Sequence, residues 1–244
     1  MSIEYSLRRD LSSSEGKSVR LGLLGGSFNP VHRCHLSIAQ SARQLLNLDR
    51  VLFIPTGDPP HKQSRTLADA QHRYRMVELA IQDIPEFALT DIEIRRTGKS
   101  YSIDTVRAIQ QEYGPDTSLF FIIGLDAFLD LPSWKEAGLL LKTCDFVVIS
   151  RPSTRFVTLA SVPFFNEVPR DRLEALDAAT QDRADVPLAN GRILTFLRLP
   201  PCESSASEIR ARLRDGRPLA NLLPPLVESY ILREGLYRED GERF

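Results

Sequence analysis

The sequence has little cysteine, no long apolar run and almost no net charge, and each shortage excludes a class of protein. Its three cysteines, Cys34, Cys144 and Cys202, are too few and too scattered for a disulfide framework, which favours a reducing, cytoplasmic compartment. Charged residues interrupt the most hydrophobic stretch, so no segment reaches membrane-spanning length. A formal net charge of −1 gives no reason to expect nucleic acid or an anionic membrane as a partner.

Length and composition fit an ordinary globular protein. The chain has 244 residues, 42% of them hydrophobic, which is enough for one large core. We expect a flexible extension over residues 1–19, because this segment is polar and lacks a signal-peptide core. A single domain is expected over residues 20–238, followed by a short tail over 239–244. The sequence leaves a homo-oligomer open.

Apolar runs alternate with segments of helical periodicity along most of the chain. The predicted strands are 21–24, 51–55, 87–94, 119–123, 146–149 and 193–199. This alternation predicts an α/β fold: a Rossmann-like, doubly wound parallel sheet with helices on both faces and a C-terminal helical segment. In such sheets, ligands bind beyond the carboxyl ends of the strands, near the point where the strand order reverses.

Three helix starts are predicted from capping residues. Ser102 can cap one helix, Ser133 and Glu136 form a capping box for a second, and Ser205 with Glu208 does the same for a third. A final helix is expected from Pro224-Pro225 to just before Gly235. The pattern of residues 151–192 predicts little regular structure, apart from a helix expected from Arg170 to about Thr180.

The most informative segment joins the first strand to a helix. Gly25 and Gly26 suit a turn where the backbone approaches a ligand closely, and Ser27 and Phe28 follow them. Apolar residues at helical spacing predict a helix from about His35, which places His32 and His35 at its N-terminus. Free amides and the helix dipole attract anions there. The segment therefore predicts a phosphate site, with two imidazoles as hydrogen-bond donors.

A second anion site is predicted near the C-terminus. Ser205 and Ser207 place hydroxyl groups at a helix start, and Arg210 follows one turn later. Taken alone, S-x-x-E is more often only a helix cap. Together with the first segment, the functional interpretation becomes the better one.

Both segments resemble motifs of the nucleotidyltransferase superfamily. G-G-S-F-N-P-V-H-R-C-H is similar to its G-G-x-F-D-P-x-H-x-G-H signature, and S-A-S-E-I-R is similar to its I-S-S-T-x-I-R element. Between them, D-P-P-H-K, Y-S-I-D-T, I-G-L-D and F-V-V-I-S-R-P resemble, in this order, bacterial nicotinate-nucleotide adenylyltransferases. The resemblance covers roughly residues 20–237.

The resemblance implies that ATP and nicotinate mononucleotide are the substrates, and that deamido-NAD and pyrophosphate are the products, in NAD biosynthesis. It implies that His32, His35 and Arg210 are catalytic, with Mg²⁺ bound through the ATP phosphates rather than by a carboxylate cage. The implied ATP-phosphate ligands are Gly25, Gly26, Ser27, Phe28, Ser205 and Ser207.

The acceptor side is implied to use Lys62, Ser102, Thr105, Asp126 and Trp134. Trp134 would stack on the pyridine ring, and amides at the helix start of Ser102–Thr105 would bind the nicotinate carboxylate. Each has a plainer alternative: Trp134 as a core residue, Asp126 as a turn residue, and Lys62 as a solvated loop residue.

This chain departs from the superfamily motifs at three positions. Asn29 replaces an aspartate, Ala206 replaces a serine, and Cys34 replaces the glycine between the histidines. We expect Asn29 to be tolerated and Cys34 to crowd the adenosine pocket, so that Cys34→Gly lowers the apparent KM for ATP.

The same residues bear on three other functions. A zinc site at His32, Cys34 and His35 is disfavoured, because residues this close cannot easily supply three tetrahedral ligands. A pantetheine-phosphate adenylyltransferase would share the first motif but not Trp134 or Y-S-I-D-T. A nucleotide-binding regulator without turnover is conceivable because of Cys34, but both histidines and Arg210 are retained.

Overall fold

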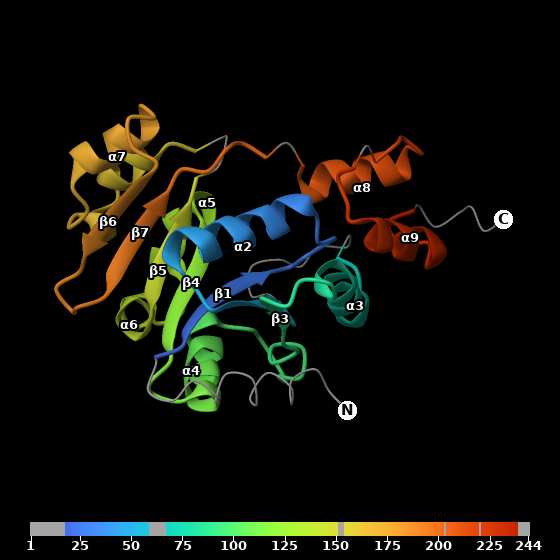
Figure 1. Ribbon diagram of the computed structural model, residues 1–244, viewed down its shortest axis with the longest axis horizontal. Helices are drawn as coiled ribbons and strands as arrows, with labels where there is room; N and C mark the ends of the chain where they lie inside the picture. Colours follow the sequence, from blue (N-terminus) through green and yellow to red (C-terminus); the bar gives the residue numbers. More distant parts are fainter. Residues whose placement is uncertain (1–17, 59–66, 151–153, 203, 220, 239–244) are drawn as a thin grey trace.

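A seven-stranded sheet forms the centre of the computed structural model, which describes residues 18–58, 67–150, 154–202, 204–219 and 221–238 (Figure 1). The strands lie in the order β3-β2-β1-β4-β5-β7-β6, and all pairs are parallel except β6 with β7. The strands are β1 (Arg20–Gly26), β2 (Arg50–Pro55), β3 (Phe87–Leu89), β4 (Ser118–Gly124), β5 (Asp145–Ile149), β6 (Arg183–Pro187) and β7 (Ile193–Leu197).

Helices cover both faces of this sheet, as the alternation of apolar runs predicts. On one face lie α2 (Arg33–Leu46), α3 (Ala70–Ile81), α8 (Ala206–Arg214) and α9 (Pro225–Arg233). On the other lie α4 (Ser102–Tyr113), α5 (Leu125–Leu129), α6 (Ala137–Thr143) and α7 (Arg170–Asp177). Short 3-10 helices occupy Leu131–Ser133, Phe156–Ser161 and Pro163–Phe165. The α/β doubly wound prediction is confirmed.

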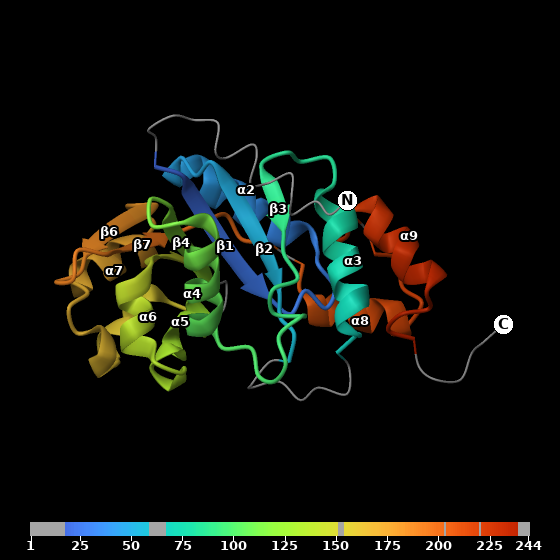
Figure 2. The same cartoon turned by 90° about the horizontal axis from the view of Figure 1, so that it is seen from below.

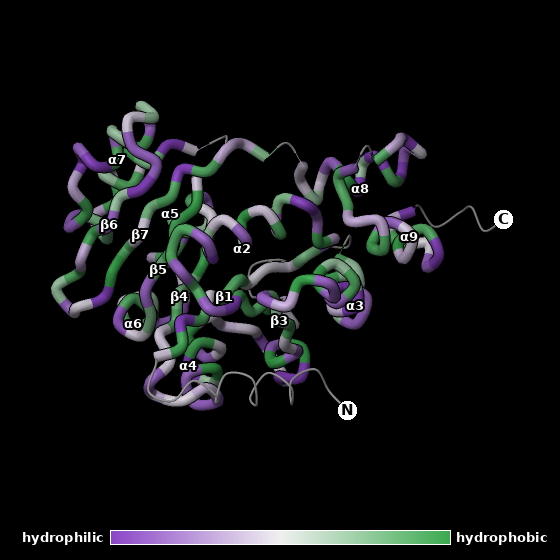
Figure 3. The backbone as a smooth tube through the Cα atoms, in the orientation of Figure 1, coloured by the Kyte–Doolittle hydropathy of each residue, from purple (hydrophilic) through white to green (hydrophobic). Residues whose placement is uncertain are grey.

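Each face of the sheet has its own apolar core. Leu21 and Leu23 of β1 point to the α4 face, whereas Leu24 belongs to the core beneath α2 and α3. This division follows from the alternation of side chains along a strand. The hydropathy colouring in Figure 3 shows the inner strands as largely hydrophobic, with polar residues concentrated on the outer surfaces of the helices. Within the described residues, no helix is long and apolar enough to cross a membrane.

The strand order indicates at which point along the carboxyl-terminal edge of the sheet, formed by the ends of the parallel strands, a ligand would bind. The chain winds from β1 outward to β2 and β3, then returns to β4 on the other side of β1 and continues outward through β5. The reversal therefore lies between β1 and β4, where adjacent parallel strands diverge in their connections. Beyond this edge, α9 packs against α3, and α8 lies on the same side of the molecule, at the arrowhead end of β1 (Figure 2).

Several predicted boundaries were wrong. β1 continues through Gly25 and Gly26 instead of turning there, and α2 begins two residues before the predicted start. Ser133 and Glu136 form no capping box: the Ser133 hydroxyl donates to Asp130 O (2.7 Å) at the end of a 3-10 turn, while Glu136 adopts a left-handed conformation before α6. Tyr101, not Ser102, is the N-cap of α4.

Candidate active site

The two histidines of the first motif lie together at the start of α2. His32 is the N-cap residue, and its backbone N–H donates to Nδ1 of His35 (3.1 Å). Their ring centroids are 3.8 Å apart, and Phe28 packs edge-on against the His35 ring at 5.0 Å. Because Nδ1 of His35 accepts a hydrogen bond, a neutral His35 carries its proton on Nε2. That nitrogen is then a donor suited to an anion.

The glycines before the histidines leave room on one side. A side chain built on Gly25 would meet nothing within 4 Å, whereas one on Gly26 would lie 3.3 Å from the Phe28 ring. Gly25 is exposed at the carboxyl end of β1, and Phe28 is buried with a left-handed φ of 44°. The segment thus presents open backbone beside the two imidazoles.

The second motif begins α8, and Arg210 connects it to the first. Its Nη1 donates to the backbone oxygen of Asn29 (2.7 Å), and its Nη2 donates to the Ser207 hydroxyl (3.3 Å). Ser205 is the N-cap, with its hydroxyl accepting from the Glu208 N–H (3.1 Å). The two helix starts, far apart in sequence, are therefore held beside each other.

Only half of the predicted capping box at Ser205 forms. The Glu208 carboxylate accepts from Arg212 Nε (2.7 Å), and this contact lowers the pKa of Glu208 below its usual range. The ion pair with the residue one turn later competes with the return bond to the N-cap backbone. The Glu208 amide donates to the Ser205 hydroxyl, whereas the amides of Ala206 and Ser207 have no acceptor within the helix.

Asn29 joins three separate parts of the chain. Its side-chain oxygen accepts from the Ala68 N–H (3.0 Å) and from the Tyr237 hydroxyl (2.8 Å), and Asn29 is only 5% exposed. Burial raises the pKa of Tyr237, so its hydroxyl is protonated and can donate at neutral pH. Both bonds use an oxygen that asparagine and aspartate share, which gives the replacement in the motif a physical basis.

Arg73 of α3 donates hydrogen bonds to backbone oxygens of the loops near the histidines. This guanidinium is 1% exposed and donates to the backbone oxygens of Ser27 (2.8 Å), Ala68 (2.9 Å) and Gly57 (3.4 Å). Burial lowers the pKa of Arg73, but the group remains charged at neutral pH. It thereby connects the loop after β1, the loop after β2 and the start of α3.

Three of the predicted acceptor residues, Ser102, Asp126 and Trp134, lie at the start of α4, in α5 and after the 3-10 helix that follows α5. Ser102 is the first residue of α4, and the amides of Asp104 and Thr105 already donate to Tyr101 O. The amides of Ser102 and Ile103 therefore remain as the helix's outward donors. Asp126 is exposed in the first turn of α5, directly after β4. Trp134 is half-buried and packs edge-on against Phe121, with ring centroids 6.3 Å apart.

The Thr105 side chain lies behind this helix start. It is 2% exposed, and its hydroxyl donates to Glu93 Oε1 (2.8 Å) while accepting from Arg96 (2.9 Å). Burial raises the pKa of Glu93, with Thr105 and Arg96 opposing this shift. Thr105 thus belongs to a buried network behind the helix start and does not face the edge of the sheet. Lys62 lies outside the described residues.

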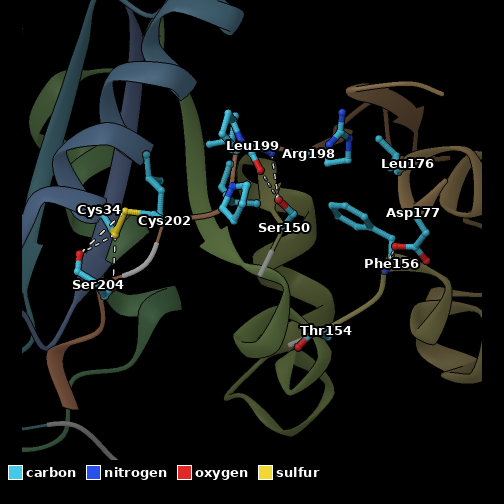
Figure 4. A pocket seen from close by; sticks show the side chains of 14 residues that line it. Cys34, Ser150, Thr154, Phe156, Leu176, Asp177, Arg198, Leu199, Cys202 and Ser204 are labelled. Carbon is cyan, nitrogen blue, oxygen red and sulfur yellow. Dashed lines mark hydrogen bonds between the residues drawn. A yellow bond between two sulfur atoms is a disulfide. The ribbon is translucent and has the colours of Figure 1, made fainter. Parts of the chain in front are cut away.

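A cavity of about 230 Å³ lies beside Cys34 (Figure 4). Its wall includes Ile149 and Ser150 at the end of β5, Pro200 and Pro201 after β7, and Ser204 before α8. In Figure 4 a disulfide between Cys34 and Cys202 forms one side, and Phe156, Leu176 and Asp177 lie across from it. The cavity opens next to the α2 and α8 helix starts.

No three His, Cys, Asp or Glu residues gather into a metal-binding group within the described ranges. The histidine side chains of the first motif instead pack on each other, and Cys34 is bonded to Cys202. The zinc interpretation therefore gains no support from the geometry.

Residues 23–212 match the cytidylyltransferase-like family. The chain is 37% identical over 226 residues to a "Probable nicotinate-nucleotide adenylyltransferase" of Thermoanaerobacter sp., covering 93% of this chain and 98% of that one. It is 40% identical over 228 residues to the protein of the same description from Geotalea daltonii, covering 91% and 99%.

The chain belongs to the nicotinate-nucleotide adenylyltransferase family. Among solved structures, the Plasmodium falciparum nicotinic acid mononucleotide adenylyltransferase complexed with NaAD matches with a TM-score of 0.67. That match has 18% sequence identity and covers 90% of this chain and 97% of the other. At this identity it supports the fold, which agrees with the doubly wound sheet described above.

Three features of this family member could not be predicted from its sequence. They are the Cys34–Cys202 disulfide, the hydrogen bonds of the buried Arg73 to backbone oxygens, and the Asn29–Tyr237 hydrogen bond. The bonded cysteines are 168 residues apart and the Asn29–Tyr237 pair 208 apart, so no local pattern announces either. The spacing of the cysteines predicted no disulfide framework and gave no sign of this single bond, which forms because the fold brings Cys34 and Cys202 together. Arg73, within a helix, reads as an ordinary surface residue.

Proposed function

We propose that this protein transfers AMP from ATP to nicotinate mononucleotide, giving deamido-NAD and pyrophosphate. Family membership supports the proposal, and one observation carries it: Arg210 joins the α8 helix start to Asn29, beside the paired imidazoles of α2. Two helix starts with hydroxyl, imidazole and guanidinium donors suit a chain of phosphates. We further propose that the reaction takes place in the cytoplasm.

In this reaction, a phosphate oxygen of the mononucleotide attacks the α-phosphorus of ATP, and the bond to pyrophosphate breaks. No nucleophilic side chain is required, since positioning and charge stabilisation dominate such transfers. His35, which keeps its proton on Nε2, and His32 would donate to the α-phosphate oxygens as charge develops. Arg210, Ser205 and Ser207 would hold the departing pyrophosphate. Gly25, Gly26, Ser27 and Phe28 would supply close backbone for the phosphates.

The adenosine would occupy the cavity beside Cys34, which adjoins both helix starts. Its apolar wall of Ile149, Pro200 and Pro201 suits a flat base. Mg²⁺, bound through the ATP phosphates and water, would neutralise charge on them. The donor set here fits that mode, because it offers cationic and hydroxyl groups to the phosphates and no cluster of carboxylates among the described residues.

The acceptor would lie on the β4 side of the switch point. Trp134 would stack on the pyridine ring, and the outward amides at Ser102 would bind the nicotinate carboxylate. Asp126 would bond a ribose hydroxyl, and Lys62 would approach a phosphate. Thr105 would act indirectly, because its hydroxyl holds the buried Glu93 behind the helix start.

Pyrophosphate release tests the proposal. Purified protein with ATP and Mg²⁺ is given nicotinate mononucleotide, its amide or phosphopantetheine, one at a time. We expect release with nicotinate mononucleotide, at a higher kcat/KM than with the amide. Preference for phosphopantetheine would mean that phosphopantetheine, and not nicotinate mononucleotide, is the acceptor. No release with any acceptor, together with measurable ATP binding, would favour a nucleotide-binding regulator.

A further inference from the structure

The disulfide links the two halves of the candidate ATP site. Cys34 is the second residue of α2, between the paired histidines, and Cys202 lies in the connection from β7 to α8. Their Cα atoms are 5.8 Å apart, within the range that a disulfide spans. The bond therefore crosses between the same two segments that Arg210 joins on the phosphate side.

The two sulfur atoms differ in solvent exposure, an arrangement that suits thiol–disulfide exchange. Cys202 is exposed, whereas Cys34 is 2% exposed behind it. An incoming thiolate can reach Cys202 first, and Cys34 then becomes the leaving sulfur at a helix N-terminus, a setting that stabilises thiolates. The Ser204 hydroxyl lies 2.8 Å from the Cys34 sulfur and can donate to it.

The third cysteine is not part of this chemistry. Cys144 is fully buried, and its sulfur contacts Leu140 O (3.8 Å) within the core. Burial raises the pKa of the Cys144 thiol far above its usual range, so it stays protonated and unreactive. It serves as an internal control for any measurement on the pair.

We propose that Cys34 and Cys202 form a reversible thiol–disulfide site that restricts nucleotide binding when oxidised. The proposal rests on the proposed function, which places adenosine in the adjoining cavity. In oxidation, the two thiols lose two protons and two electrons to a low-molecular-weight disulfide, which is reduced to two thiols. A dithiol reductant reverses the reaction and becomes a disulfide itself.

The tether at the cavity wall explains the direction of the effect. The base would lie in the cavity beside the disulfide, which forms one side of that cavity (Figure 4). The oxidised pair holds its two backbones 5.8 Å apart at the cavity wall. Reduction removes this tether and lets the connection before α8 move away from α2. The reduced form is therefore the one that accepts adenosine fully.

The experiment compares ATP binding in the two redox states of the full chain. Protein is equilibrated with oxidised glutathione or with dithiothreitol, then alkylated under denaturing conditions and weighed intact. We expect three alkylated cysteines after reduction and one after oxidation. Calorimetry with ATP alone should give a Kd about tenfold higher for the oxidised form, equivalent to about 1.4 kcal/mol. The KM for nicotinate mononucleotide should stay unchanged.

Matched variants assign the effect to the pair. Cys202→Ser and Cys34→Gly should bind ATP equally in both redox states, and Cys34→Gly should have the lowest apparent KM for ATP. Cys144→Ser should keep the full redox response. The proposal is overturned if three cysteines remain alkylated after oxidation, or if oxidised protein binds ATP as tightly as reduced protein. Reduced protein that binds ATP but releases no pyrophosphate contradicts the proposed function alone.

Discussion

Replacing Arg73 by methionine should destabilise the fold and loosen the phosphate loop together. The substitution keeps much of the side-chain volume but removes a 1% exposed guanidinium from the backbone oxygens of Ser27, Ala68 and Gly57. The 3.4 Å contact to Gly57 counts for little, so two strong bonds are lost. A charged hydrogen bond is worth about 1.5–3 kcal/mol, and removing a buried charge recovers part of the loss.

The net expectation is a loss of about 3 kcal/mol in the free energy of unfolding, with a Tm lower by about 6–12 °C. Urea unfolding followed through Trp134, the single tryptophan, measures the first quantity. The KM for ATP should rise as well, because the Ser27 carbonyl loses its anchor. Arg73→Lys should fall between the two proteins, since one ammonium cannot serve carbonyls on three segments.

Arg75→Met, two residues along the same helix, is the matched control. Its side chain is 51% exposed and pairs with Glu78 at the surface, so the change should stay within about 0.5 kcal/mol. If Arg73→Met lost less than about 1 kcal/mol and kept its KM for ATP, the anchoring role of Arg73 would be refuted.

Three further predictions concern single side chains of the site. Arg210→Ala should lower kcat/KM for ATP by about 10²-fold, whereas Arg214→Ala, exposed on the same helix, should leave it unchanged; equal effects would contradict the assigned role. Trp134→Ala should raise the KM for nicotinate mononucleotide about tenfold without changing that for ATP, and Trp134→Phe should restore most of the affinity if stacking is the cause. Burial raises the pKa of Glu93 above its usual 4.5, so the native state loses stability as pH rises through that raised pKa. Glu93→Gln should gain stability relative to the parent protein over the same pH interval. If the difference in free energy of unfolding between the two proteins, measured with urea, did not vary with pH, the pKa shift would be excluded.

The sequence revealed those parts of the molecule whose signals are local. The strand pattern predicts the sheet because buried parallel strands are continuous apolar runs, and the two phosphate motifs are contiguous strings at strand-to-helix junctions. The same reasoning failed at Ser133, where Pro132 initiates a 3-10 turn in place of a capped α-helix. It missed β6, an edge strand of five residues with alternating exposure and two charged side chains.

What the sequence could not reveal depends on tertiary proximity. Nothing near Asn29 indicates that Tyr237 bonds its side chain, and nothing near Cys34 indicates a partner in Cys202. Thr105 lies in a motif, yet whether it faces the ligand or the buried Glu93 is decided by how α4 packs on the sheet. Motifs thus identify the residues of a site more readily than the direction in which each one points.

The bond between Arg210 and Asn29 makes the candidate site depend on two distant parts of the chain. The two residues are 181 positions apart in the sequence. β1 precedes Asn29, and all the other strands lie between Asn29 and Arg210. A chain that ends after β7 would keep every strand, but it would lose Arg210 and the buried Ile209, Val227 and Ile231 from the core beneath α2 and α3. Loss of the last two helices should therefore lower the free energy of unfolding as well as nucleotide binding, whereas Arg210→Ala removes only the link across the site.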